Sequence, residues 1–299
     1  MQIFDLAVSY TWKYDIEFIN LIEKLFQKNG LKTFIIYKQN IHEVASLLRQ
    51  RKLLFKSYLD RASDEDPEFE IITKLLIRKR CYLINPHKKT KKATDKSYFH
   101  KKLLRKNFRL PKTFIIESFD KSETLYLSDA NLKELKIPFI IKPAIFSGGG
   151  QGVVKDASSI EQIQTERMKG HNEKYLIQEK VHPVKLENKR AWFRVFWAFG
   201  KVIPTWWDDH THIYHTLTKE QIAKYKLQQL IKITKRLARV ANIDYFSTEI
   251  VLAKNHQFIL IDYINDQCDM RLQSLHVDGV PDVVVTQFIE QMRRKVSAL

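Results

Sequence analysis

Apolar positions in the first ninety residues alternate between two spacings. Short apolar runs, "QIFDLAV" at 2–8 and "KTFIIY" at 32–37, are typical of buried strands. Between them, 16–26 carries its large apolar residues at helical spacing, while Asp15 before it can cap a helix and Gly30 after it can end one. The alternation continues with strands predicted at 53–59 and 81–85 and helices at 41–50 and 66–79. Strands that alternate with helices predict a small, mostly parallel α/β sheet.

A second pattern begins near residue 93, after a basic stretch that we interpret as a linker. A helix is predicted over 94–107, and Pro111 marks a fresh start. An apolar strand then leads into a glycine-rich loop, a returning strand at 153–155 and a serine-capped helix at 158–168.

The rest of the chain is rich in strands. They are predicted at 175–181, 190–199, 202–207, 247–253 and 257–264, with helices at 219–242 and 281–296. The last two strands flank the short segment "KNHQ" and are expected to form a hairpin. We therefore divide the chain into three units, 1–92, 93–175 and 176–299. The predicted fold class is α/β, and α+β for the chain as a whole.

Composition supports a globular protein. The chain has 299 residues, of which 44% are hydrophobic and 12% aromatic, enough for a substantial core. No apolar run approaches the roughly 20 residues that a membrane span needs. The N-terminal segment lacks a basic start and a long apolar middle, so a cytoplasmic location without membrane contact is expected.

The charge is strongly positive. Lys and Arg number 51 against 34 Asp and Glu, which gives +17, and much of the excess lies in 76–110. Such a balance favours an acidic partner, such as a nucleotide, a polyphosphate, an acidic peptide or nucleic acid. A solvated basic face that aids solubility explains the charge run equally well.

Glycine is concentrated in one place. The chain has eight glycines, and four of them fall within "GGGQG" at 148–152. A loop without Cβ atoms can bring several backbone N–H groups close to a phosphate. The loop does not run directly into a helix and lacks G-x-x-x-x-G-K-[ST] and G-x-G-x-x-G, which excludes the P-loop and Rossmann motifs.

Two carboxylates lie in the apolar strands of the predicted C-terminal hairpin. Burial of Glu249 or Asp262 alone would cost several kcal/mol unless a positive charge compensates. Paired carboxylates of this kind suit Mg²⁺, which commonly takes one or two of them plus nucleotide phosphates. Asn265 or Asp266 can add a third ligand. Alternatively, each acid faces solvent or pairs with a lysine.

These features in combination resemble the ATP-grasp superfamily. The residues that carry the likeness are Lys142 at the end of "FIIK", the glycine loop, the strand ending in "QEKV" and the acidic hairpin. The chain looks most similar to the glutathione synthetase and ribosomal-protein glutamate ligase branch over nearly its whole length. The resemblance implies an ATP-grasp fold behind an N-terminal parallel pre-ATP-grasp domain, with ATP and Mg²⁺ bound between the two later units.

The resemblance assigns the ATP-binding residues. Lys96 in "TDK" and Lys142 match the family's phosphate-binding lysines, and Arg194 matches the arginine that faces the phosphates and the intermediate. Glu249 and Asp262 match the two acidic Mg²⁺ ligands. The loop that closes over the phosphates comprises Ser147, Gly148, Gly149, Gly150 and Gly152, and the segment that holds adenine comprises Gln178, Glu179 and Val181.

Three departures from the family pattern affect this assignment. The acid that stands two positions before the arginine is replaced by Trp192, so ribose binding is transferred to Glu187. The family's E-x-N becomes Asp262 followed three positions later by Asn265, which leaves Asn265 and Asp266 as alternatives. The segment "PTWWDDHTHIYHT" also departs, and its rings can line a substrate pocket or serve as core and surface residues: Trp206, Trp207, His212 and His215.

Arg61 and Arg271 are the candidates for holding a substrate carboxylate, and we place Arg271 with the catalytic residues. Structural ion pairs explain either arginine equally well. The resemblance implies a carboxylate–amine ligase that acts through an acylphosphate on a small acid, an amino acid or a peptide. The alternatives are a kinase of a polyanionic small molecule, or a protein that binds nucleic acid through 76–110 and has a vestigial ATP site.

Overall fold

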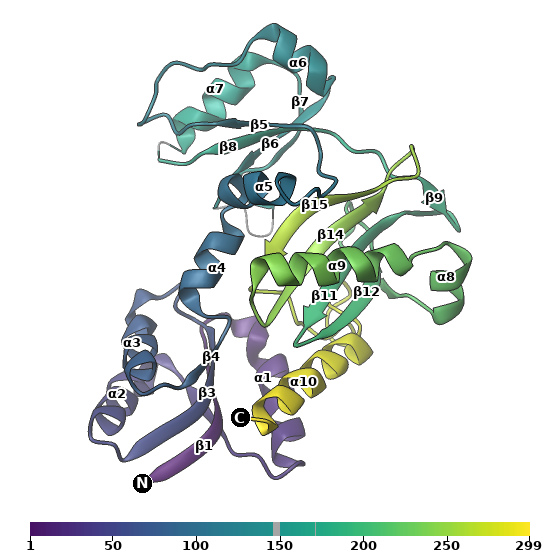
Figure 1. Cartoon of the computed structure of the whole chain (residues 1–299). Helices are drawn as coiled ribbons and strands as arrows, with labels where there is room; N and C mark the ends of the chain where they lie inside the picture. The colour runs from purple at the N-terminus through teal and green to yellow at the C-terminus, as the bar shows by residue number, and fades with distance from the viewer. Residues whose placement is uncertain (146–149, 171) are drawn as a thin grey trace.

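The computed structural model describes residues 1–145, 150–170 and 172–299, and three large sheets organise them (Figure 1). A two-stranded ribbon of β9 (Lys185–Leu186) and β10 (Lys189–Arg190) accompanies them. In this described part of the chain, no helix has both the length and the apolar character needed to cross a bilayer.

The first sheet is parallel throughout, with strand order β2-β1-β3-β4, which confirms the predicted α/β class. Its strands are β1 (Gln2–Tyr10), β2 (Thr33–Ile36), β3 (Leu53–Arg61) and β4 (Tyr82–Ile84). Helices α2 (Ile41–Arg49) and α3 (Glu70–Arg78) share one core cluster, in which Val44 and Ile72 pack with Phe55. α1 (Ile16–Gln27) belongs to a different cluster, with Leu6 and Val8 of β1.

Asp15 precedes α1 as predicted, but its side chain does not cap the helix. The carboxylate instead accepts two hydrogen bonds from the guanidinium of Arg61, at 2.7 and 2.8 Å. The expected cap is therefore wrong, because a buried ion pair competes for the same oxygens.

The last helix, α10 (Asp282–Ser297), packs beside α1 on the N-terminal sheet (Figure 1). Its Phe288 contacts Phe18 of α1 edge-to-face, with ring centroids 6.2 Å apart. Leu6, Phe26 and Met292 belong to the same core cluster. The two ends of the chain thus share one hydrophobic core.

The second sheet is antiparallel, with order β5-β8-β6-β7. Its elements are β5 (Thr113–Ile116), α6 (Asp129–Leu135), β6 (Phe139–Pro143), β7 (Val154–Ala157), α7 (Ile160–Lys169) and β8 (Tyr175–Glu179). The predicted serine cap is confirmed, since Ser159 accepts from the backbone N–H of Gln162 in a capping box. β6 and β7 flank the glycine loop, as the sequence predicts.

The third sheet has order β13-β12-β11-β14-β15 and is antiparallel. Its strands are β11 (Trp192–Ala198), β12 (Lys201–Trp207), β13 (Tyr214–Thr216), β14 (Tyr245–Leu252) and β15 (Phe258–Asn265). α9 (Gln228–Ala241) covers one face, where Leu237 shares a core cluster with Phe193 and Ile250. Because side chains alternate along a strand, Arg194 and Glu249 point to the opposite face.

Two helical predictions change in the structure. The stretch interpreted as a linker forms α4 (His87–Thr94), which leads into α5 (Lys96–Leu104). The helix predicted over 219–242 is divided into α8 (Lys219–Lys224) and α9, because Lys226 adopts a left-handed φ of 54° that no α-helix continues through. Short 3-10 helices cover Lys13–Asp15, Lys38–Asn40 and Pro67–Phe69.

Candidate active site

Two carboxylates face each other across the β14–β15 hairpin, on the face of the sheet away from α9. The register pairs Glu249 directly with Asp262. Opposed residues on antiparallel strands have Cβ atoms about 5 Å apart, so the two carboxylates share one small region. The sequence prediction that the hairpin brings these acids together is confirmed.

Glu249 is held by two donors from β11. Arg194 pairs with Oε1, and the indole N–H of Trp192 donates to Oε2 over 3.1 Å. The guanidinium of Arg194 also lies over the ring of Trp207, with its carbon 4.5 Å from the centroid. Sequence analysis identified Trp192 only as the residue that replaces the family's acid, yet its indole N–H orients a site carboxylate. Its place two residues before Arg194, on the same face of a strand, is the signal that could have identified it.

Asp262 is surrounded by three cations from different elements. Lys96 at the start of α5 places its Nζ 3.9 Å from Oδ1. Burial alone would raise the pKa of Asp262, but the charges of Lys96, Lys142 and Arg194 hold this pKa below its usual value. The carboxylate therefore stays ionised at neutral pH.

Lys142 lies one residue before the end of β6. Its Nζ donates to the carbonyl of Ile261 over 3.1 Å, and burial lowers the pKa of its ammonium to about 8, partly opposed by the charge of Asp262. The backbone N–H of Lys96 donates to the carbonyl of Ala144 over 2.9 Å. The side chain of Lys142 is thus attached to β15, and the backbone of Lys96 is attached to the residue that follows β6.

The polar atoms of this site fit a magnesium–phosphate group. Oδ1 of Asp262 and Nε of Arg194 are buried and have no hydrogen-bond partner among the described residues. A carboxylate oxygen in that state is a suitable ligand for a hard cation, and a guanidinium N–H suits a phosphate oxygen. Nowhere in 1–145, 150–170 and 172–299 do three His, Cys, Asp or Glu side chains gather as a metal group, so phosphates would supply further ligands.

The described end of the glycine loop has the backbone geometry that requires glycine. Gly150 and Gly152 have φ values of 83° and 68°, in the left-handed region that other residues rarely adopt. A Cβ on Gly150 would meet nothing within 4 Å, so the requirement comes from backbone conformation and not from space. The predicted loop residues Ser147, Gly148 and Gly149 lie outside the described residues.

Comparison with known proteins gives no match to a family model or to a curated protein. Solved structures do match over almost the whole chain. A D-alanine–D-alanine ligase from Bacillus anthracis complexed with ATP has a TM-score of 0.68 at 15% identity, covering 98% of this chain and 96% of that chain. The chain has the ATP-grasp fold.

Two further structures support this assignment. The ATP-grasp ligase PsnB complexed with a minimal precursor has a TM-score of 0.66 at 10% identity, covering 99% of this chain and 98% of that chain. An ATP-grasp RimK domain protein from Sphaerobacter thermophilus has a TM-score of 0.60 at 16% identity, covering 96% and 98%. The ATP-grasp fold that the sequence resemblance implies is therefore confirmed.

The bulge in the ATP-grasp hairpin bears on the third metal ligand. The register pairs Glu249 with Asp262 and Ser247 with Asn265, so β15 carries one extra residue between the two pairs. Asn265 therefore lies on the same face as Asp262 although three positions separate them. Asp266 has different neighbours, which include Asp64 and Arg61. Burial and the carboxylate of Asp64 raise the pKa of Asp266 to about 6. The geometry favours Asn265 over Asp266.

The residues assigned to the adenosine have described partners within the protein. The buried Gln178 donates through Nε2 to Thr113, at 2.8 Å, and to the hydroxyl of Tyr263, at 3.3 Å. Glu179 accepts from the backbone N–H of Lys112 over 2.8 Å. These bonds attach β8 to its neighbouring strand and to β15, and Val181 lies two residues after the end of β8. The adenine role of the segment stays a prediction.

Glu187, the candidate for ribose, lies in the turn between β9 and β10. Its carboxylate accepts from Gln221 at 2.9 Å and Tyr225 at 2.7 Å, and pairs with Lys224 at 3.3 Å. These contacts attach the ribbon to α8, and no described contact links Glu187 to the Glu249–Asp262 pair. Its ribose role therefore stays a prediction.

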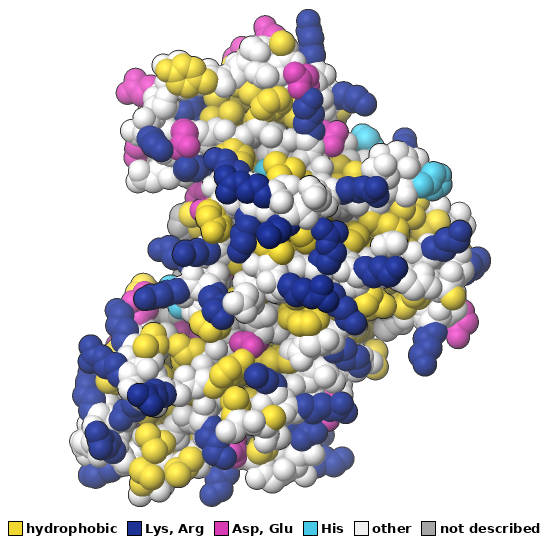
Figure 2. All heavy atoms as spheres, viewed as in Figure 1, with side chains coloured by type: hydrophobic (Ala, Val, Ile, Leu, Met, Phe, Trp, Pro, Cys, Tyr) yellow, Lys and Arg dark blue, Asp and Glu magenta, His cyan; other side chains and the backbone are white. Residues whose placement is uncertain are grey.

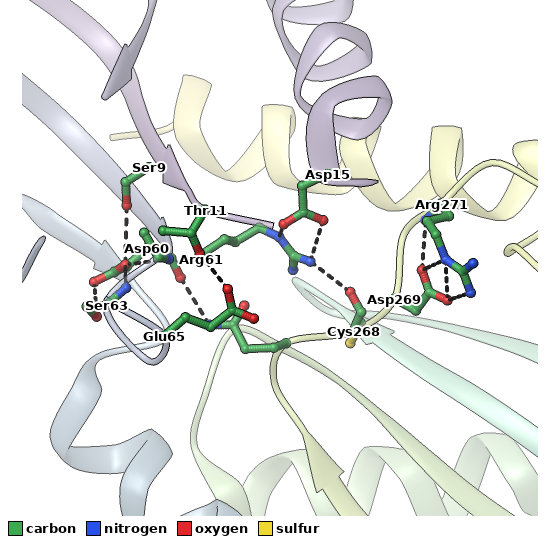
Figure 3. Close-up of polar contacts among 12 residues, drawn as sticks. Ser9, Thr11, Asp15, Asp60, Arg61, Ser63, Glu65, Cys268, Asp269 and Arg271 are labelled. Carbon is green, nitrogen blue, oxygen red and sulfur yellow. Dashed lines mark hydrogen bonds and ion pairs between the residues drawn. The ribbon is translucent and has the colours of Figure 1, made fainter. Parts of the chain in front are cut away.

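Both candidate substrate arginines are engaged by carboxylates (Figure 3). Arg61 binds Asp15 and also donates to the carbonyl of Cys268 over 3.1 Å, which joins β3 to the segment after β15. Arg271 is held by Asp269 at 2.7 Å and by Asp278 at 2.9 Å. These contacts match the alternative in which the arginines form structural ion pairs.

The aromatic segment that runs from the end of β12 into β13 has residues in three different environments. Trp206 is buried against Phe193, with centroids 4.7 Å apart, and so belongs to the core. Trp207 stacks on His212 at 5.4 Å and also contacts Arg194. His215 is exposed. Of the four, Trp207 contacts the charged site directly among the described residues, and His212 reaches it through Trp207.

Proposed function

We propose that this protein is an ATP-dependent ligase that joins a carboxylate to an amine through an acylphosphate. The observation that carries the proposal is the convergence of Lys96, Lys142 and Arg194 on the Glu249–Asp262 pair. The three cations come from α5, β6 and β11, so only the folded chain brings them together. The ATP-grasp fold supports this interpretation, because the similar structures named above include ligases.

In this proposal, Glu249, Asp262 and Asn265 hold Mg²⁺, which would neutralise phosphate charge when bound. Lys96, Lys142 and the glycine loop bind the phosphates. Arg194 faces the transferred group, oriented by its contact with Glu249. Adenine contacts the 178–181 segment, and ribose contacts Glu187. Arg271 acts as a positioning residue, because its two ion pairs hold the connection between β15 and α10.

The chemistry needs charge stabilisation and no protein nucleophile. A carboxylate oxygen of the acid substrate attacks the γ-phosphorus of ATP, and ADP leaves. The amine then attacks the acyl carbon, and phosphate leaves. Preorganised cations stabilise the charge that develops on phosphate oxygens, and burial of the site excludes water that would hydrolyse the acylphosphate. The similar structures include PsnB complexed with a precursor peptide, which supports an amino-acid or peptide substrate. A cytoplasmic location remains a prediction from the sequence.

A product assay tests the proposal. Purified protein is incubated with ATP, Mg²⁺ and mixtures of acids with amines or peptides, and ADP release, free phosphate and product mass are measured. We expect ADP and free phosphate in equal amounts together with an amide. Lys142→Met should reduce turnover by at least about 100-fold, whereas Lys133→Met, on the exposed face of α6, should not. A phosphoester without free phosphate would instead establish the kinase alternative and contradict the ligase.

A further inference from the structure

We propose that a basic groove on the α9 side of the molecule binds the sugar–phosphate backbone of a nucleic acid strand. Two adjoining cavities form this groove, with volumes of about 580 and 1060 Å³, and they share Phe108 and Arg236. Six cationic side chains line the first cavity: Lys89, Lys92, Lys102, Lys106, Arg236 and Arg239. The second adds Arg109, Lys226 and Lys232.

The fold assembles these cations from distant parts of the sequence. Those from 89–109 lie on α4, on α5 and in the segment that follows α5, and those from 226–239 lie on α9 or just before it. Figure 2 shows Lys and Arg side chains gathered over α4, α5 and α9 on this face. The basic run of the sequence therefore supplies only one wall, and α9 supplies the other.

The groove has an unbalanced charge. No Asp or Glu is among the residues that line either cavity, and within the described residues none of these nine cations forms an ion pair. Lys102 donates a hydrogen bond to the backbone carbonyl of Val240, and Arg236 donates one to the backbone carbonyl of Lys106. These two bonds link the two walls of the groove. Like charges on a concave surface repel one another, and an anionic partner removes that repulsion.

The arrangement favours a chain of phosphates over an acidic protein segment. Lys232, Arg236 and Arg239 recur at helical spacing on one side of α9 and span about 10 Å along its axis. The aromatic rings at the bottom of the groove are almost inaccessible to a partner: Phe99 is 1% exposed, and Phe108, which lies under the guanidinium of Arg236, is 7% exposed. A protein partner draws most of its affinity from apolar anchors in pockets, and this floor offers little surface for them. Regularly spaced exposed cations suit phosphates, which bind through charge.

The groove is separate from the candidate active site. α9 packs on the face of the third sheet that carries Phe193 and Ile250, whereas Arg194 and Glu249 point to the other face. The proposal of nucleic acid binding therefore does not rest on the proposed ligase activity, and failure of one leaves the other standing. It would bring a nucleic acid, or a complex that contains one, to the enzyme.

Fluorescence anisotropy of the full chain with a labelled mixed-sequence RNA of about 20 nucleotides tests the groove. The groove variant carries Lys92→Gln, Lys106→Gln and Arg239→Gln. The matched control carries Lys28→Gln, Arg49→Gln and Lys52→Gln, which are exposed on the N-terminal unit, form no described ion pair and remove the same charge. Circular dichroism checks that both variants stay folded, and ATP titration checks that the active site is unchanged.

We expect wild-type affinity to fall steeply with salt between about 50 and 200 mM, and the groove variant to bind at least about ten-fold more weakly. The slope of log affinity against log salt should become shallower by about 2, because each lost phosphate contact to a single strand contributes about 0.7. The control should stay within about two-fold of wild type. Absence of binding by wild type, an equal loss in the control, or equally tight binding of polyglutamate of the same length would each overturn the proposal.

Discussion

At the scale of single residues, the candidate site consists of charges that change one another's ionisation. Asp262 is kept ionised by three cations, while burial lowers the pKa of Lys142 to about 8. Burial makes the charged ammonium of Lys142 less stable than it is in water, and the nearby carboxylates offset only part of this effect. The negative charge of a phosphate would stabilise the ammonium further. The site is therefore ready to receive negative charge.

His100 predicts a specific pH dependence of stability. Burial and the nearby charge of Lys142 lower the pKa of its imidazole from 6.5 to about 4, and Nδ1 bonds the hydroxyl of Tyr263 at 2.5 Å. Between these two pKa values the unfolded chain binds a proton that the folded chain does not bind. The free energy of unfolding should therefore fall as the pH drops from 6.5 towards 4, by about 3 kcal/mol from this group.

Urea denaturation of wild type and His100→Asn across this pH range measures the contribution. Asn keeps an oxygen acceptor near the position of Nδ1 but does not titrate there. We expect the variant to lose less stability than wild type on acidification. Parallel curves for the two proteins would show that His100 does not carry the effect.

At the scale of elements, the β14–β15 hairpin shows how a local irregularity determines a site. The bulge lets Asp262 and Asn265 share a face although their spacing in sequence is odd. Spacing alone left Asn265 and Asp266 as alternatives, because a bulge does not appear in the alternation of apolar residues.

The bulge predicts different effects at these two neighbouring positions. Asn265→Ala should weaken ATP binding in the presence of Mg²⁺ by about ten-fold and change it little without Mg²⁺, since it removes a ligand oxygen. Asp266→Asn should leave both affinities nearly unchanged, because its neighbours are Asp64 and Arg61. Calorimetric titrations of ATP into each variant provide the comparison, and the reverse order of effects would refute the face assignment.

Periodicity predicted most helices and strands and the pairing of Glu249 with Asp262. It did not predict the break at Lys226, because a left-handed residue leaves the apolar spacing of a helix intact. The role of Trp192 was also missed, since a strand tryptophan gives no sequence signal that separates a hydrogen-bond donor from a core residue. The wall that α9 gives to the basic groove depends on contacts between distant segments, which no local pattern contains.

At the scale of the whole molecule, the last helix joins the two ends of the chain. α10 and α1 contribute to one core cluster with β1, and the Arg61–Asp15 pair reaches the carbonyl of Cys268 from the same side. The N-terminal unit is thereby fixed to the C-terminal unit, next to the end of β15. The unit boundaries at 92 and 175 stay a prediction, and this core joins residues of the first unit to residues of the third.

This shared core predicts cooperative unfolding. Phe288 is fully buried and contacts Phe18, Phe199 and Tyr245. Phe288→Ala should reduce the free energy of unfolding by about 3–5 kcal/mol and should lower the stability of both end units together. Far-ultraviolet circular dichroism and tryptophan fluorescence should give coincident transitions for wild type. Val283→Ala, at an exposed position of α10, is the control and should change stability by less than about 0.5 kcal/mol.

Calorimetric titration of ATP, with and without Mg²⁺, tests the central claim most directly. Wild type should bind ATP more tightly with Mg²⁺, and Asp262→Asn should lose that difference, because the substitution removes a carboxylate from the Glu249–Asp262 pair. Lys142→Met should weaken binding under both conditions, while Lys133→Met should match wild type. Absence of ATP binding by the wild-type protein under either condition would contradict the account.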